Sequence, residues 1–239
     1  MASYLVDGIF LAVTVAVTLL LVRRSLLDSL TVCGATLISA LIALNCFEPA
    51  ASFISNNMLA ANDIWIASFV WFTSLIIIFA WLAAMIWIGF QKALGQTDLQ
   101  LGRFDVVGRW FFSSICGYML AAFLLTSMHT FPAPRDYWGA FPPELHRRSS
   151  PIAAFGPDYQ LLTLSEYISN PRSAISGTPW KPTGPLFETD IHGNRWASFP
   201  VRYALWRETT QSLMQDYYPE DANETAIADV EQSSKNAFS

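Results

Sequence analysis

Few side chains in this chain have the types and spacing that catalysis or metal binding requires. The three histidines, His129, His146 and His192, are far apart and lack the spacing of metal ligands. Asp136 and Glu144 are candidates for an acid pair, but they fall in a proline-rich segment where such pairs arise by chance. The sequence also lacks a phosphate-binding loop, a nucleophile elbow and a zinc-protease pair. We therefore predict no enzymatic activity, no metal and no cofactor.

The most informative charged cluster is the segment 102–109, GRFDVVGR, which precedes a long apolar run. On a helix, Asp105 and Arg109 are four residues apart and can form an ion pair. A charged residue drawn into a membrane bundle needs such a partner. The cluster has two interpretations, an ion or proton gate and a structural anchor at the lipid headgroups. We favour the structural anchor.

The uneven distribution of charge divides the chain into two parts. Residues 1–130 hold eleven of the thirty-three Asp, Glu, Lys and Arg residues, and residues 131–239 hold the other twenty-two. The net charge of −5 excludes the basic footprint of a nucleic-acid-binding protein. The cysteines Cys33, Cys46 and Cys116 match no metal or redox spacing, and we expect them to serve as small buried apolar side chains.

Four apolar runs must position these charges, and the clearest of them is the run 64–91. It contains no charged residue between Asp63 and Lys92. As a helix it would be about 42 Å long, whereas the hydrocarbon core of a bilayer is about 30 Å thick. We therefore predict a transmembrane helix that tilts or that protrudes at one end.

The other predicted spans cover residues 4–22, 29–47 and 110–128. The second span carries a face of small residues that suits helix packing or, alternatively, a pore lining, and we favour packing. We expect a polar connection at 48–63, interrupted by Pro49, and a segment after Lys92 that lies among the headgroups.

Orientation follows from the positive residues in the short loops. The loops after the first and third spans hold five of them, whereas residues 1–3 and 48–63 hold none. This asymmetry predicts that both chain ends lie outside the cytoplasm. The five residues are Arg23, Arg24, Lys92, Arg103 and Arg109.

The tail, residues 131–239, is rich in both proline and aromatic residues. Eleven prolines between Pro132 and Pro200 block long helices and central strands, while the aromatic residues argue against simple disorder. We predict an irregular layer with two short helices, one at about 158–168 and one from Pro200 to about Tyr217. After about residue 218 we expect an acidic, disordered end, in which the sequon 223–225 carries little weight.

The segment around Asp105 resembles the colicin V production protein (CvpA) family of small four-span inner-membrane proteins. In that family an aspartate opens the first span and an arginine-containing turn follows it, the places of Asp7 and of the pair Arg23-Arg24 here. Asp105, Phe112 and Gly117 fall at the matching offsets of the family's segment before the fourth span. Other positions depart from the pattern, since Val106 and Cys116 replace arginines and Arg109 and Ser113 replace glycines.

The resemblance covers about residues 4–130 and extends more loosely into the tail. It implies a role in colicin V production or export, or in envelope homeostasis, without an established catalytic activity. Roles of the family's missing glycines and arginines do not transfer to this chain.

We thus predict an all-α membrane protein with four transmembrane helices, followed by an irregular extracytoplasmic tail with short helices. The expected function is that of a non-enzymatic accessory in the bacterial inner membrane. Its expected partners are the lipid bilayer and, through the tail, a second copy or an envelope protein, with no nucleic acid. The alternative is a channel or transporter subunit that uses the region around Asp105 and Arg109 together with Asp7 and Asn45. The candidate structural or functional residues are Asp7, Arg23, Arg24, Asp105, Arg109, Phe112 and Gly117.

Overall fold

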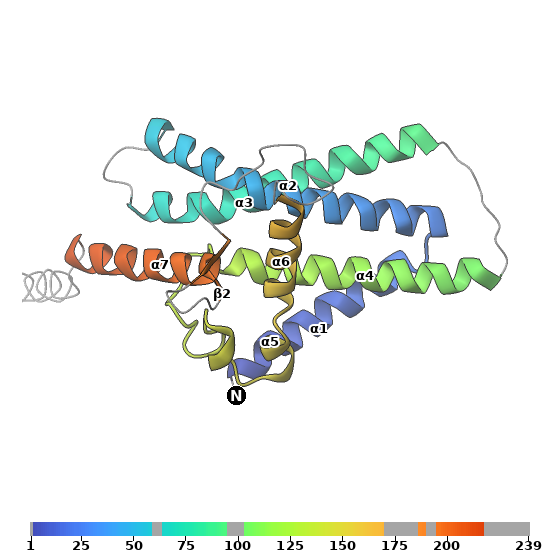
Figure 1. Ribbon diagram of the computed structural model, residues 1–239. Coiled ribbons are helices and arrows are strands. Elements are labelled where there is room, and N and C mark those ends of the chain that lie inside the picture. Colours follow the sequence, from blue (N-terminus) through green and yellow to red (C-terminus); the bar gives the residue numbers. More distant parts are fainter. Residues whose placement is uncertain (1, 59–63, 95–102, 170–185, 190–194, 218–239) are drawn as a thin grey trace, which may run out of the picture.

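A computed structural model describes residues 2–58, 64–94, 103–169, 186–189 and 195–217 of the chain (Figure 1). Four long helices come first: α1 (Ala2–Leu21), α2 (Leu26–Met58), α3 (Ile64–Leu94) and α4 (Arg103–Met128). Each is long and apolar enough to cross a membrane. The prediction of four apolar, membrane-length helices is therefore confirmed. These four helices indicate a multi-pass membrane protein.

The long helices stand side by side in the order α3, α2, α4, α1. Helix α2 packs against both α3 and α4, and α4 packs against both α2 and α1. In the apolar segments of α1 and α3, only 22% and 17% of the residues are buried, against 50% in those of α2 and α4. The exposed apolar surface of the two edge helices is what a bilayer would cover.

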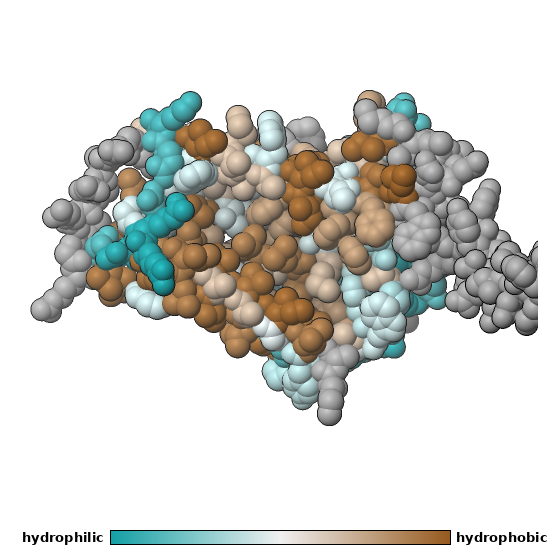
Figure 2. Space-filling model, turned by 180° about the vertical axis from the view of Figure 1, so that it is seen from behind, coloured by the Kyte–Doolittle hydropathy of each residue, from teal (hydrophilic) through white to brown (hydrophobic). Residues whose placement is uncertain are grey.

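Apolar side chains cover the face of this helix row, and hydrophilic ones gather at one end (Figure 2). We call this end, which holds residues 22–25, the loop end. The opposite end carries the described part of the tail, residues 129–217, which we call the C-terminal layer. The end of the row that it covers is the layer end.

Helix α2 continues well beyond its predicted end. The expected polar connection from residue 48 is wrong for residues 48–58, because the helix runs through Pro49 to Met58. Phe47 and Ala51, on either side of the proline, are fully buried, so packing outweighs the hydrogen bond that proline removes. Helix α4 likewise begins seven residues before the predicted span and includes Asp105 and Arg109.

The C-terminal layer consists of short elements. They are η1 (Leu145–Arg147), α5 (Pro151–Phe155), α6 (Pro157–Ser169), the hairpin β1 (Phe187–Thr189) and β2 (Arg195–Ala197), and α7 (Ser198–Tyr217). The predicted tail helices at about 158–168 and 200–217 are therefore confirmed to within two residues. The expected acidic end and the sequon lie outside the described residues.

One apolar core joins the layer to the helix row. Leu161 and Leu162 of α6 and Phe199 of α7 pack against α2, α3 and α4. On α2, Ala40 and Ala43 are fully buried in this core, so the small-residue face serves packing, as we favoured. Helix α6 runs across the row from α4 towards α2 (Figure 1).

The excess length of α3 is covered by the layer. At its layer end, Trp71 contacts Tyr203 and Trp206 of α7 edge to face, with ring centroids 6.0 Å apart in each pair. Phe69 and Phe72 both contact Phe131 in the same manner. Aromatic residues of the tail therefore cover this end of α3, as they could cover an end that protrudes from the bilayer.

Candidate functional site

The candidate site is the junction between the layer end of the helix row and the C-terminal layer. Three buried polar anchors cross it, from α1, from α4 and from α2. Each joins a residue of the apolar half of the chain to a residue of the tail, and each must satisfy its charge without water.

The first anchor is Asp7 of α1, whose carboxylate caps α5. It accepts hydrogen bonds from the backbone N–H groups of Ile152 and Ala153, at 3.2 and 3.0 Å, and from the Ser150 hydroxyl at 3.0 Å. The first N–H groups of a helix have no partner within the helix, and a carboxylate satisfies them well. Asp7 is thus a buried structural contact between α1 and α5.

The second anchor is a fully buried triad of Asp158, Arg148 and His129. Asp158 lies in the first turn of α6, Arg148 directly after η1, and His129 directly after α4. Arg148 donates two hydrogen bonds of 2.8 Å to the two carboxylate oxygens of Asp158, a bidentate geometry that is among the strongest in proteins. His129 Nε2 lies 2.8 Å from Asp158 Oδ2.

The surroundings of the triad decide its protonation. Burial lowers the pKa of His129 to about 4, although Asp158 works against this shift. His129 is therefore neutral at pH 7, and its Nε2–H donates to Asp158. For Asp158, burial favours the neutral acid, but the hydrogen bonds from Arg148 and His129 outweigh it and hold the pKa of the carboxyl well below its usual range.

Aromatic rings enclose the triad. The His129 ring stacks on Phe141 at 4.9 Å between centroids, and the Arg148 guanidinium lies 4.2 Å from the centre of the same Phe141 ring. Tyr159 closes the other side of Arg148, and burial raises its pKa to about 12. These contacts leave the triad without exposed surface, so it acts as an internal connection.

The third anchor joins Glu48 of α2 to α7. The Tyr203 hydroxyl donates to Glu48 Oε1 at 3.0 Å, and the Arg202 guanidinium pairs with the same oxygen. Burial first, and the neighbouring Glu48 second, raise the pKa of Tyr203 well above its usual value. The hydroxyl therefore stays protonated and available as a donor.

Arg207 of α7 also contributes to the junction. Among the described residues, no carboxylate lies within ion-pair distance of its guanidinium. Its fully buried guanidinium donates to the backbone carbonyls of His129 and of Arg135, the latter at 2.8 Å. Burial lowers its pKa from the usual value. The carbonyls at the end of α4 carry the negative end of the helix dipole, which suits a cation there.

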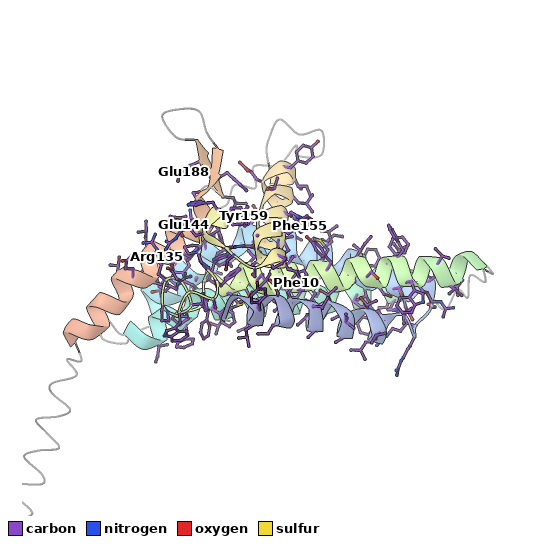
Figure 3. The ribbon with its side chains drawn as sticks, turned by 90° about the horizontal axis from the view of Figure 1, so that it is seen from below. Phe10, Arg135, Glu144, Phe155, Tyr159 and Glu188 are labelled. Atoms are coloured by element: carbon purple, nitrogen blue, oxygen red, sulfur yellow. The ribbon has the colours of Figure 1, made fainter. Side chains whose placement is uncertain are left out.

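The residues that the sequence suggested as an acid pair belong to an ion-pair network on the outside of the layer. Asp136 and Glu144 both lie 3.4 Å from Arg147, and Glu144 also pairs with Arg135 at 2.9 Å. Arg135 and Glu144 are labelled in Figure 3, where they lie on the α7 side of the layer. His146 is exposed, and His192 lies outside the described residues. Within the described part of the chain, no group of acidic, histidine and cysteine side chains is arranged to hold a metal ion.

The other candidates from the sequence lie towards the loop end. Asp105 and Arg109 form the expected ion pair at 2.8 Å, and Arg109 also approaches the Arg24 carbonyl at 3.5 Å. The side chains of Arg23 and Arg24 are exposed. Phe112 packs on the cluster of Leu21, Cys33 and Cys116.

Gly117 marks the closest approach of two long helices. A β-carbon at this position would lie 2.5 Å from the carbonyl oxygen of Thr14 on α1. Nearby, the Thr18 hydroxyl donates to the Ser113 carbonyl at 3.4 Å, across the same helix pair. Gly117 therefore permits the crossing of α1 and α4, a role that close-packed membrane helices commonly give to glycine.

Sequence reasoning missed most of the junction residues, namely Glu48, His129, Arg148, Asp158, Arg202 and Arg207. One signal was present, because Glu48 is a charge that directly follows an apolar run. For the others, the sequence predicted at most the helix that carries them, because their partners are far apart along the chain.

Comparison with known proteins finds no matching protein-family model, curated protein or solved structure for this chain. The resemblance to colicin V production proteins therefore depends on Asp7, the pair Arg23-Arg24 and the segment around Asp105 alone.

Proposed function

We propose that this protein is a non-enzymatic accessory of the bacterial inner membrane, of the colicin V production type. It would act in envelope homeostasis or in toxin production and secretion. One observation carries the proposal: side chains of the types used in catalysis are buried at the junction in fixed contacts. Asp158, Arg148 and His129 have no surface that a substrate could reach.

The same contacts suit a protein that presents a rigid surface. Three anchors and a shared apolar core hold the C-terminal layer on the helix row, so the layer and the row form one unit. A rigid layer can bind a partner without a large loss of conformational entropy. The partner is then an envelope protein or a second copy of the chain.

The distribution of charge supports a layer outside the cytoplasm. Arg23, Arg24 and Lys92 lie at the loop end, where the positive-inside rule assigns the cytoplasm. Both chain ends would then be outside the cytoplasm.

The test is reconstitution of the purified full-length chain in lipid vesicles. We expect neither turnover of envelope metabolites nor ion flux when the chain is alone. Affinity capture from native membranes should retain the same envelope proteins with the parent and with Leu30→Ala, a lipid-facing control. Tyr167→Ala and Leu205→Ala, at exposed apolar positions of the layer, should weaken that capture. Turnover by the chain alone would contradict the proposal.

The alternative is a channel or transporter subunit. It is favoured by the pair of Asp105 and Arg109, which remains partly exposed at the loop end. A flux assay that compares the parent with Asp105→Asn decides between the two functions. Flux that the parent shows and the variant loses would support the transporter, and zero flux in both would remove it.

A further inference from the structure

We propose that one edge of the C-terminal layer is inserted among the lipid headgroups on the layer side of the bilayer. We call it the lipid-facing edge. It is formed by Tyr4 and Leu5 of α1, by Trp138, and by Ala154 and Phe155 of α5, all of which are exposed. The layer would then be bound to the membrane by its own surface as well as by the four spans.

The first observation is a strained turn that presents Trp138. Tyr137, Trp138 and Gly139 have consecutive positive φ angles of 50°, 55° and 80°. The left-handed region is unfavourable for a residue with a side chain, and such strain is usually retained where it serves a function. Here the turn separates two neighbouring aromatic side chains. Tyr137 points inwards and donates to the Met128 carbonyl, while Trp138 is 81% exposed.

The second observation concerns the backbone of α5. Within this apolar helix, PIAAF, the side chains of Pro151, Ala154 and Phe155 are exposed. Asp7 satisfies two of the first N–H groups, and at the other end the N–H of Gly156 donates to the Ala153 carbonyl at 3.2 Å. A segment that enters lipid must satisfy its backbone within the protein, because lipid offers no hydrogen bonds. Helix α5 meets much of this requirement.

The third observation is continuity with the lipid-facing surface of α1. Tyr4, Leu5 and Ile9 are exposed on α1, whereas the Asp7 carboxylate between them turns into the junction. The charge therefore does not interrupt the apolar face. Val6 and Phe10 pack in one cluster with Tyr137 and Ile152, so α1, the strained turn and α5 meet there. Figure 3, which shows the molecule from below, labels Phe10 of α1 and Phe155 of α5.

These observations favour lipid over a protein partner at this edge. The edge extends a helix surface that already needs lipid to cover it, and tryptophan and tyrosine prefer the headgroup level. Trp138 is 81% exposed. At the headgroup level its apolar ring can contact acyl chains while its N–H donates to water or to a headgroup.

The test measures contact between Trp138 and lipid in the full-length protein. Parent and Trp138→Phe are reconstituted in phosphatidylcholine–phosphatidylglycerol vesicles, with either ordinary or brominated acyl chains next to the headgroups. The difference in fluorescence between parent and variant reports Trp138. We expect brominated lipid to reduce this difference by about half or more, because bromine quenches indole on contact at the headgroup level.

Trp206→Phe is the matched control, since Trp206 of α7 packs against Trp71 of α3 and its difference signal should not respond to bromine. A second probe, Ala154→Trp in the Trp138→Phe background, places an indole on α5 and should be quenched as Trp138 is. A Trp138 signal that ignores bromine would overturn the proposal. Quenching by aqueous acrylamide would then indicate water at the edge, and protection from both quenchers would indicate a protein partner.

Discussion

At the scale of single residues, charge is used to hold the protein together. Asp7, Glu48 and Asp158 are acidic residues, a type that ion paths and acid–base catalysis also use. In the structure each of them accepts hydrogen bonds from a helix end, a guanidinium or a tyrosine across the junction. Replacing them should therefore lower the free energy of unfolding.

Replacement of Asp158 tests the triad. Asp158→Asn removes the charge that compensates the buried Arg148, and breaking a buried ion pair in this way costs about 3–5 kcal/mol. The free energy of unfolding of the full-length protein in mild detergent should fall by that amount. Asp136→Asn, at a partly exposed ion pair, is the control and should cost no more than about 1 kcal/mol. Equal effects of the two replacements would contradict the role of the triad.

Acid should loosen the junction. The pKa of His129 is about 4 in the folded protein and near 6.5 when unfolded, so the unfolded chain binds the extra proton first. Stability should therefore be complete above pH 6.5 and fall as the pH drops towards 4. The proton would enter a fully buried space that faces Arg148 and Arg207 as well as Asp158.

Protease sensitivity of the C-terminal layer between pH 7 and pH 4 measures this dependence. The glutamine of His129→Gln keeps a hydrogen-bond donor for Asp158 but does not titrate. The protease sensitivity of this variant should therefore stay constant from pH 6.5 to about 4.5. Loss of Asp158 ionisation would still destabilise the variant at lower pH, because its pKa is depressed by its partners. Identical profiles for parent and variant would exclude His129 as the cause.

At the scale of elements, the packing of α1 on α4 depends on one small residue. Gly117→Ala places a β-carbon 2.5 Å from the Thr14 carbonyl, a distance at which the backbone must shift. Overpacking of this kind costs about 1–3 kcal/mol, so the melting temperature should fall. Gly34→Ala on α2 is the matched control, because a β-carbon there meets nothing within 4 Å. That control should be neutral or slightly stabilising.

At the scale of the whole molecule, the helix row has a loop end rich in basic residues and a layer end covered by the tail. We expect the layer end to face away from the cytoplasm. A membrane-impermeant maleimide applied to intact cells should label His146→Cys and leave Ser25→Cys unlabelled, since both positions are exposed but at opposite ends. Labelling of Ser25→Cys alone would reverse the orientation.

The parent chain controls for the native thiols in this experiment. Cys33 and Cys116 are buried, and Cys46 is half-buried, as the sequence suggested for small apolar side chains. Their background labelling should be low. Permeabilised cells should label both introduced positions, which verifies that each can react.

Local patterns in the sequence determined the four apolar helices, the two principal helices of the tail and the pairing of Asp105 with Arg109. Each of these depends on residues that are neighbours along the chain or one helical turn apart. Even there, the end of α2 was set by packing around Pro49, beyond the reach of a local rule.

Only the tertiary structure decided that the tail covers its own helix row and that Asp7, Glu48, His129 and Asp158 are its anchors. The partners at the α1 and α2 anchors are 143–155 residues apart in sequence, so no spacing rule can join them. Folding brings them together because the aromatic tail and the layer ends of α2 and α3 bury each other's apolar surface. The buried charges then pair across that contact, since water is absent there.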